Sequence, residues 1–531
     1  MTARPSKISL KNYDMVYAIS QEAINEKLLQ FVETLPLPIR QIQIHGKAAT
    51  DNKLTIVKDP ATADCSLTGQ WDEAYNNLNI VDLNSPKGNK TLILTIAIVN
   101  GRFSQKQHPA QPSEFVANPI WRVKYLMDLT LRPAEKKLLI DRFEAVKDID
   151  ESIFIIEQLL LDTDSARFFK LEGVDMPPAA QQQVAELTKA YLQQLPERLI
   201  VGVCAKTRPG AEVPSNAFKP SWIDFCITPQ LPGGPVNPNL DSLNYLLMSQ
   251  NHPPPPQLPA NFDENWIRNE HEHGRVGLAK PLFLDSMCQS LSSLLKHLSP
   301  EIYVAPGNKL DMRENQKNKF EFNRFTANPD NGHFAQYRYN SEKECCNIKD
   351  EGRWFGVDKI IDQMIAKYSI ILNLLLQDNG VFCRGIMVLH ASEKHTRTHL
   401  IGGFIPTPFP FPFEKELPHT TYEFSFKLEP VDAQMSHSHV LAYRITEPNF
   451  NKEPQVVKRN DFFTWLFVNH KEGLQHLVTG IREQITESNL QQLNDSLRDC
   501  GKFVFPGGDA FRFNKRELNN NNDLLTQLHY K

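Results

Sequence analysis

The 531-residue sequence lacks the features that mark several common protein classes. It has no run of about 20 apolar residues, the length needed to cross a membrane as a helix, and its first residues contain no apolar core typical of a secretion signal. Its eight cysteines are scattered without a C-x-x-C pair, which disfavours a zinc site or a disulfide framework. We therefore expect a protein that is cytoplasmic as synthesised, with no transmembrane segment and with reduced cysteines. Release without a classical signal peptide and peripheral contact with a membrane stay open.

An excess of basic charge is absent as well. The 58 Lys and Arg residues are interspersed with 62 Asp and Glu residues, which gives a formal net charge of −4. A nucleic-acid binder needs concentrated positive charge against the phosphates, so we expect no nucleic-acid partner. No phosphate-cradling loop, nucleophile elbow or zincin helix occurs, which argues against an ordinary hydrolase or nucleotide enzyme. The sequence therefore predicts no catalytic residues and no cofactor.

The first third of the chain shows helical spacing at both ends and strand-like runs between them. Ile24, Leu28 and Phe31 recur on one face of a helix that follows Ser20, a good N-cap, and that ends before Pro36. A second helix is expected over 180–195. Runs rich in Ile, Leu, Val, Phe and Thr, separated by Asn, Gly, Asp and Pro, predict antiparallel strands. These runs are 54–57, 78–83, 90–99, 152–161 and 167–171.

A proline-rich stretch follows, with twelve prolines between Pro209 and Pro259. Because proline removes donors from a strand ladder, we expect mostly extended loop with short ordered segments at 222–227 and 243–248. The second half again suggests a helix, then strands, then helices: a helix carries Leu284, Met287, Leu291 and Leu295, a strand covers 422–428, and closing helices cover 474–485 and 490–497. The run 370–376 fits either a helix or a strand.

Strand patterns outnumber helices and do not alternate regularly with them, so the sequence favours an α+β fold over a doubly wound parallel sheet. The length exceeds that of one typical core. The predicted organisation is an N-terminal module over 1–205, a proline-rich connecting region over 206–262 and a C-terminal module over 263–531.

Three groups of polar residues are candidates for catalytic or metal sites. Glu270-His271-Glu272-His273 could hold a divalent ion, but a solvated polar turn before Gly274 is the favoured interpretation. His390, His395 and His399 lie in a β-rich context, where the last two would not meet as they would on a helix. Asp82, Glu157, Asp162 and Asp164 could supply paired carboxylates, although solvated charge is favoured. A metal-dependent enzyme is thus the least favoured hypothesis.

Segments near both ends and in the middle of the chain resemble one protein family. The stretch Tyr13-Asp-Met-Val-Tyr-Ala-Ile-Ser-Gln-Glu-Ala-Ile-Asn25 is similar to the opening of the clostridial forty-seven-kilodalton accessory protein, which occurs with Orf-X proteins in botulinum neurotoxin gene clusters. Phe503-Val-Phe-Pro-Gly-Gly-Asp-Ala-Phe-Arg-Phe513 resembles that family's closing hairpin, and in this hairpin alternating Phe rings would share one face. The segments 152–162 and 243–248 are weaker matches in the expected order.

The resemblance implies the tubular lipid-binding (TULIP) fold, in which strongly bent antiparallel sheets wrap around amphipathic helices in two modules. It implies a non-catalytic bacterial protein that binds lipid or another apolar molecule, with a toxin or sister accessory proteins as further partners and a place in virulence. In such a fold the apolar helix faces would line a hydrophobic cavity, whereas in an ordinary domain they would be core. The expected lipid-binding residues are Ile24, Leu28, Phe31, Leu284, Met287, Leu291 and Leu295. The alternative is an interaction protein with a filled core.

Overall fold

The structure is a computed structural model in which two compact units are each built from antiparallel sheet. Unit 1 contains residues 1–286, 432–440 and 498–531, and unit 2 contains residues 287–431 and 441–497. The residues that the structure describes are 7–48, 54–73, 80–106, 114–141, 143, 146–147, 149–195, 199–211, 218–230, 237–257, 262, 265–269, 272–282, 301–305, 309–313, 321–324, 333–353, 356–377, 380–401, 405–407, 413–416, 420–430, 443–449, 455–456, 504–506, 511–519, 521 and 523–530. The predicted boundaries at 205/206 and 262/263 both fall inside unit 1.

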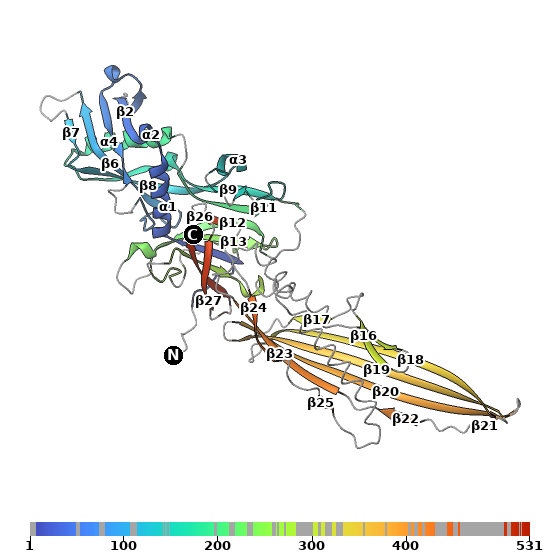
Figure 1. Ribbon diagram of the computed structural model, residues 1–531. Coiled ribbons are helices and arrows are strands. Elements are labelled where there is room, and N and C mark those ends of the chain that lie inside the picture. Colours follow the sequence, from blue (N-terminus) through green and yellow to red (C-terminus); the bar gives the residue numbers. More distant parts are fainter. Residues whose placement is uncertain are drawn as a thin grey trace. The chain divides into compact units, whose positions relative to one another are not determined.

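The first sheet of unit 1 is a curled, eleven-stranded antiparallel sheet (Figure 1). Its main path runs β26-β11-β9-β8-β6-β4-β2-β3, and β5, β7 and β10 pair at its sides. The bounds are β2 Gln41–Ala48, β3 Leu54–Val57, β4 Cys65–Trp71, β5 Val81–Asp82, β6 Thr91–Gln105, β7 Glu114–Val116, β8 Ile120–Pro133, β9 Phe154–Leu161, β10 Arg167–Glu172, β11 Ile200–Thr207 and β26 Val504–Pro506. The antiparallel pairing confirms the predicted α+β class with strand-dominated architecture.

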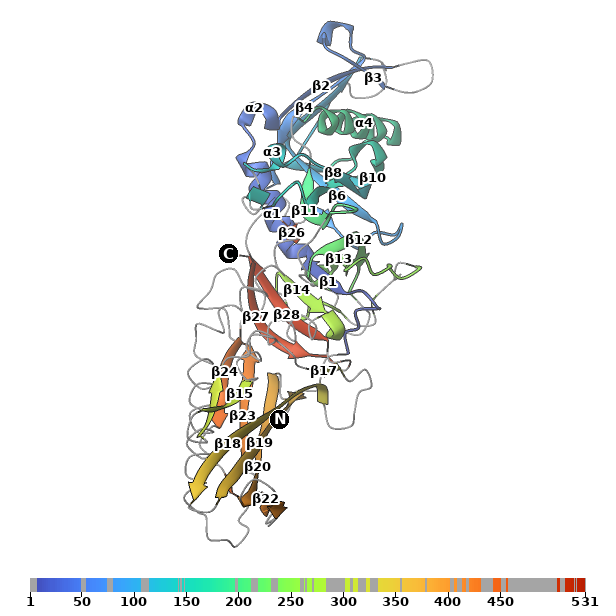
Figure 2. The ribbon, with the colours of Figure 1, turned by 90° about the vertical axis from the view of Figure 1, so that its right-hand side faces the viewer.

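The second sheet of unit 1 combines strands from both ends of the chain (Figure 2). Its order is β12-β13-β1-β14-β28-β27, with β1 Met15–Ser20 paired between β13 and β14. The other bounds are β12 Pro220–Thr228, β13 Ser242–Ser249, β14 Gly274–Leu278, β27 Phe511–Leu518 and β28 Leu524–Tyr530. The two ordered segments predicted within the proline-rich stretch are therefore strands of this sheet, and every residue of β13 is buried.

Two longer helices belong to unit 1. Helix α1, Gln21–Thr34, begins where predicted, because the Ser20 side chain accepts a hydrogen bond from Ala23 N at 3.2 Å. Helix α4, Pro178–Gln194, has proline in its first turn, where the missing N–H leaves no intrahelical hydrogen bond unmade. The short helices α2, Leu37–Arg40, and α3, Lys136–Leu139, each contain four residues. Among the described residues, no helix is both long and apolar enough to span a bilayer.

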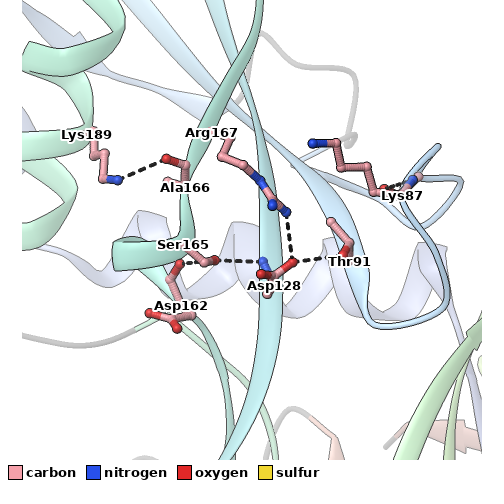
Figure 3. Close-up of polar contacts among 9 residues, drawn as sticks. Lys87, Thr91, Asp128, Asp162, Ser165, Ala166, Arg167 and Lys189 are labelled. Atoms are coloured by element: carbon pink, nitrogen blue, oxygen red, sulfur yellow. Dashed lines mark hydrogen bonds and ion pairs between the residues drawn. The ribbon is translucent and has the colours of Figure 1, made fainter.

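A polar junction holds the turn that separates β9 from β10 (Figure 3). Asp128 of β8 accepts hydrogen bonds from Thr91 Oγ1 at 2.8 Å and from an Arg167 guanidinium nitrogen at 3.1 Å. Its backbone N–H donates to Ser165 Oγ, and Lys189 of α4 donates to the carbonyl of Ala166 at 2.9 Å. Strands β9 and β10 both pair with β8, and the 3-10 turn held by this junction connects them.

The predicted closing hairpin is wrong in its pairing. β26 pairs with β11 of the curled sheet, whereas β27 pairs with β28, so Phe505 and Phe511 belong to different sheets. The hairpin turn instead lies in the asparagine-rich segment, where Asn519 Oδ1 accepts hydrogen bonds from the N–H groups of Asn521 and Asp523, both at 2.8 Å. This local side-chain turn makes β27 and β28 neighbours in sequence and in space.

Unit 2 contains a nine-stranded antiparallel sheet with three long strands, β18 His333–Arg353, β19 Gly356–Gln377 and β20 Gly380–Ile401. The ambiguous run 370–376 lies in β19 and is therefore a strand. In the central part of these strands, buried residues alternate with partly or fully exposed ones, which gives the sheet one apolar face. Its described members are Tyr337, Tyr339, Ile370, Leu372, Leu374 and Cys383.

The remaining elements of unit 2 are shorter. The predicted strand 422–428 is confirmed within β23, Thr420–Pro430. The other bounds are β15 Glu301–Ala305, β16 Lys309–Arg313, β17 Glu321–Arg324, β21 Ile405–Thr407, β22 Phe413–Glu416, β24 Tyr443–Asn449 and β25 Gln455–Val456. The helices predicted over 284–295, 474–485 and 490–497 lie outside the described residues.

Candidate functional site: the concave face of the curled sheet

Helix α4 packs on one face of the curled sheet, which we call the concave face. Tyr125 of β8 donates a hydrogen bond from its hydroxyl to the carbonyl of Ala185 at 2.6 Å, and burial raises the pKa of this tyrosine. The Trp71 ring of β4 meets the Tyr191 ring of α4 edge-on at 6.2 Å. A Cβ on Gly46 of β2 would lie 3.0 Å from a Leu187 methyl group, so glycine allows a close approach of helix and sheet.

The concave face is apolar across its central strands. Direct cross-strand partners share a face of a sheet, and residues two apart along a strand return to that face. Tyr125 pairs with Leu94, and Trp121 and Trp71 both pair with Ile98. The same face therefore carries a continuous set of residues that are each at most 5% exposed, namely Leu92, Leu94, Ile96, Ile98, Trp121, Val123, Met127 and Leu129.

Helix α1 is attached to the edge of β5, which itself pairs with β6. The Asn25 amide donates to the carbonyl of Val81 at 3.0 Å and accepts from its N–H at 2.7 Å. Gln21 Oε1 accepts from Leu83 N at 2.6 Å. These amide side chains satisfy backbone groups of β5 in the way that a further strand would. Helix α1 is thus fixed by polar contacts along this edge, while its apolar residues are buried.

Three of the seven expected lipid-binding residues lie in the described structure. Ile24 and Leu28 are each 3% exposed and Phe31 is 7% exposed, so all three are buried on α1. Leu284, Met287, Leu291 and Leu295 lie outside the described residues. Ligand contact by any of the seven stays a prediction. The concave face on β4, β6 and β8 was not assigned from the sequence, although the alternation of Leu92, Leu94, Ile96 and Ile98 could have indicated it.

Two buried polar groups on this face have no hydrogen-bond partner among the described residues. Trp121 is fully buried and its indole N–H is unpaired. Glu157 lies two residues from Leu159 on β9, and the pairing of β9 with β8 places it on the concave face. One of its carboxylate oxygens meets Lys206 Nζ at 2.8 Å, while the other has no partner. An unpaired buried polar atom is costly, so each marks a position where a ligand or water could bind.

A buried acid lies beside the beginning of α1. The Asp241 carbonyl accepts a hydrogen bond from Gln21 N at 2.9 Å, and its side chain accepts one from Gln230 N at 2.5 Å. Its second carboxylate oxygen has no hydrogen-bond partner in the part of the chain that the structure describes. Desolvation, with a smaller contribution from the nearby negative charge of Asp82, raises the pKa of Asp241 to about 6. The charged form is therefore disfavoured in the folded protein.

Asp241→Asn is expected to raise the free energy of unfolding by about 1 to 2 kcal/mol at pH 8. A carboxyl group whose pKa is raised on folding binds its proton more tightly in the folded state. Its stabilising contribution is complete below the unfolded pKa and is lost as the pH rises through about 6. The gain from asparagine should therefore disappear near pH 4. Urea unfolding at both pH values measures it, and an equal gain at pH 4 and pH 8 would show that the carboxylate charge is not the cause.

One member of the predicted Glu-His cluster, Glu272, forms a buried ion pair with Arg275. Glu270 and His271 lie outside the described residues, whereas Glu272 is 1% exposed. Glu272 Oε1 accepts from Arg275 Nε at 2.7 Å and its second oxygen accepts from Arg268 N at 3.1 Å. The favoured interpretation as a solvated turn is therefore wrong for Glu272. The sequence could not show this, because a strand partner that buries the turn is remote in sequence.

The other candidate polar groups lie on separate elements of the described structure. His390, His395 and His399 all lie on β20, where the register sets His395 opposite Asp362 and His399 opposite Asp358. Four residues of strand separate the two by about 13 Å along the chain. Asp162 caps the 3-10 turn, and Asp164 accepts a hydrogen bond from Gln193. In the described part of the chain, no group of three or more His, Cys, Asp or Glu residues is arranged to hold a metal ion.

Four cysteines, Cys65, Cys204, Cys226 and Cys383, are buried and form no disulfide. Burial raises the pKa of Cys65 to about 11 and that of Cys226 to about 12, which keeps both thiols protonated at neutral pH. For these residues the expectation of reduced, packed cysteines is confirmed.

No protein-family model and no curated protein matches the chain. Among solved structures, the chain aligns with the crystal structure of a lipopolysaccharide binding protein over 98% of this chain and 99% of that one, at 9% sequence identity and a TM-score of 0.29. At this level of similarity the alignment assigns neither a family nor a ligand to the chain. Membership of the clostridial Orf-X family therefore stays a prediction from the sequence segments described above.

Proposed function

We propose that the chain is a non-catalytic protein that binds lipid or another apolar molecule against the concave face of the curled sheet, in a TULIP-like arrangement. One observation carries this proposal: an apolar face that is continuous over β4, β6 and β8 lies beneath a helix packed across it. Burying a methylene group contributes roughly 0.8 kcal/mol, so an acyl segment that enters between α4 and this face would gain about that amount for each methylene.

The test is the lipid content of the purified full-length chain and its uptake of a fluorescent phospholipid from vesicles. We expect about one lipid per chain. Val123→Phe enlarges a buried residue of the concave face and should lower the bound amount, whereas Leu138→Phe alters a residue that is 72% exposed and should leave it unchanged. A folded wild-type chain that carries no lipid and takes up none would refute the proposal.

The toxin-accessory role rests on the sequence resemblance alone. Its support would be stable binding of the chain to a toxin or to sister accessory proteins that is unchanged by Val123→Phe. That result, together with an absence of bound lipid, would favour the alternative of an interaction protein with a filled core.

A further inference from the structure

A charged pair interrupts the apolar concave face on β9 and β11. Glu157 Oε1 accepts a hydrogen bond from Lys206 Nζ at 2.8 Å, and the two side chains are 10% and 27% exposed, respectively. Glu157 pairs across the sheet with Cys204, and Lys206 pairs with Ile155, so both side chains lie on one face. Burial raises the pKa of the Cys204 thiol, and the negative charge of Glu157 adds to this effect. The part of the sheet around the pair is therefore poorly solvated.

The second carboxylate oxygen of Glu157 indicates what kind of group the pair could bind. Glu157 Oε2 is buried and has no hydrogen-bond partner in the described structure. A buried carboxylate normally accepts hydrogen bonds at both oxygens, because leaving one unpaired forfeits the hydration it had in the unfolded chain. A cationic N–H donor would satisfy this atom. Lys206 has three N–H donors, of which Glu157 uses one, and its partial exposure leaves the others accessible.

Apolar residues lie immediately beside the pair. Leu159 is fully buried and Leu161 is 4% exposed, and both follow Glu157 on the same face of β9. An amphipathic molecule could therefore place its chain along these residues and its polar end at the pair. The ligand must offer a donor to the carboxylate and an acceptor to the ammonium group, within one headgroup.

Resting on the lipid-binding function proposed above, we propose that Glu157 and Lys206 bind the headgroup of a zwitterionic lipid that carries a primary ammonium group and a phosphate. The ammonium group would donate to Glu157 Oε2 and the phosphate would accept from Lys206 Nζ. A quaternary ammonium group has no N–H to donate, and the hydroxyl groups of a glycerol headgroup can donate only an uncharged, weaker hydrogen bond to the free oxygen. The site would thus select phosphatidylethanolamine chemistry over choline or glycerol headgroups.

A second carboxylate on the same sheet offers a matched control. Glu172 of β10 pairs with Arg122, which lies on the face opposite Tyr125. Its carboxylate accepts from Lys124 at 3.0 Å and from Lys170 at 3.2 Å, and the side chain is 30% exposed. It is therefore a lysine-paired carboxylate on the convex face.

The experiment compares extraction of three lipids by the full-length chain from vesicles that contain equal amounts of dioleoyl phosphatidylethanolamine, phosphatidylcholine and phosphatidylglycerol. The wild-type chain should extract phosphatidylethanolamine about tenfold more than either competitor, the ratio expected from one charge-assisted hydrogen bond. Glu157→Leu and Glu157→Gln should abolish this preference, while Glu172→Leu should retain it. Soluble phosphoethanolamine, added as a competitor, should displace little lipid because it lacks the acyl chains.

The outcomes separate the two proposals. Lipid uptake by the wild-type chain without a headgroup preference would overturn this inference and leave the lipid-binding function standing. An absence of any lipid would overturn both. A parallel loss of all three lipids in Glu157→Gln would assign the pair a structural role and overturn the headgroup assignment. The competition on the wild-type chain needs no variant, so a misfolded variant leaves the test intact.

Discussion

Replacing Arg275 with methionine is expected to lower the free energy of unfolding by about 3 to 5 kcal/mol. Arg275 is 3% exposed in β14, and its side chain donates to Glu272, whose side chain is fully buried. Methionine fills a similar volume but leaves the Glu272 carboxylate charged and without this partner. The cost arises from that uncompensated charge more than from the lost hydrogen bond.

Urea unfolding followed by circular dichroism measures the effect. Arg102→Met is the control, because Arg102 and Glu114 form a pair whose side chains are 65% and 52% exposed, for which a loss of at most about 1 kcal/mol is expected. Adding Glu272→Gln to Arg275→Met should recover part of the stability by removing the buried charge. If both arginine variants lose the same small free energy of unfolding, the buried pair contributes no more to stability than the exposed pair.

Asn25→Ala should lower the free energy of unfolding by about 2 to 4 kcal/mol, because it leaves the N–H and the carbonyl of Val81 without partners. Asn25 is 1% exposed and Val81 is fully buried, so water cannot readily replace the amide. The loss should loosen α1 from β5 and increase hydrogen exchange at Val81 N–H in particular.

Hydrogen exchange and urea unfolding together check this expectation. Lys27→Ala on the same helix is the control, since Lys27 meets Gln30 at the exposed surface and should change stability by less than about 0.5 kcal/mol. Global destabilisation without faster exchange at Val81 would show that the amide pair does not hold the edge of β5.

Local patterns in the sequence predicted the elements that depend on local chemistry. The helix after Ser20 follows from a capping side chain and apolar spacing, and the structure has both. The strands over 54–57 and 167–171 follow from their residue types and flanking turns. In each case the determining residues lie within a few positions of one another, so one segment contains the necessary information.

Elements that depend on remote partners were missed or misassigned. The Tyr13–Asn25 stretch contains a strand, β1, whose partners are more than 220 residues away, and its fully buried pattern gives no alternation to read. Phe505 was grouped with Phe511 because the intervening glycines suggest a turn, yet β26 pairs with β11 instead. The burial of Glu157 and Asp241 likewise depends on packing against segments distant in sequence.

The position of β1 has a consequence for the order in which the protein can form during translation. Residues 15–20 leave the ribosome early, but the sheet they join is completed by β14 at 274–278 and then by β28 at 524–530. Synthesis of the whole of unit 2 separates those two strands. The exposed edge of β14 must therefore wait for the last strand, and a nascent chain stalled within unit 2 would present that edge to chaperones or to other nascent chains.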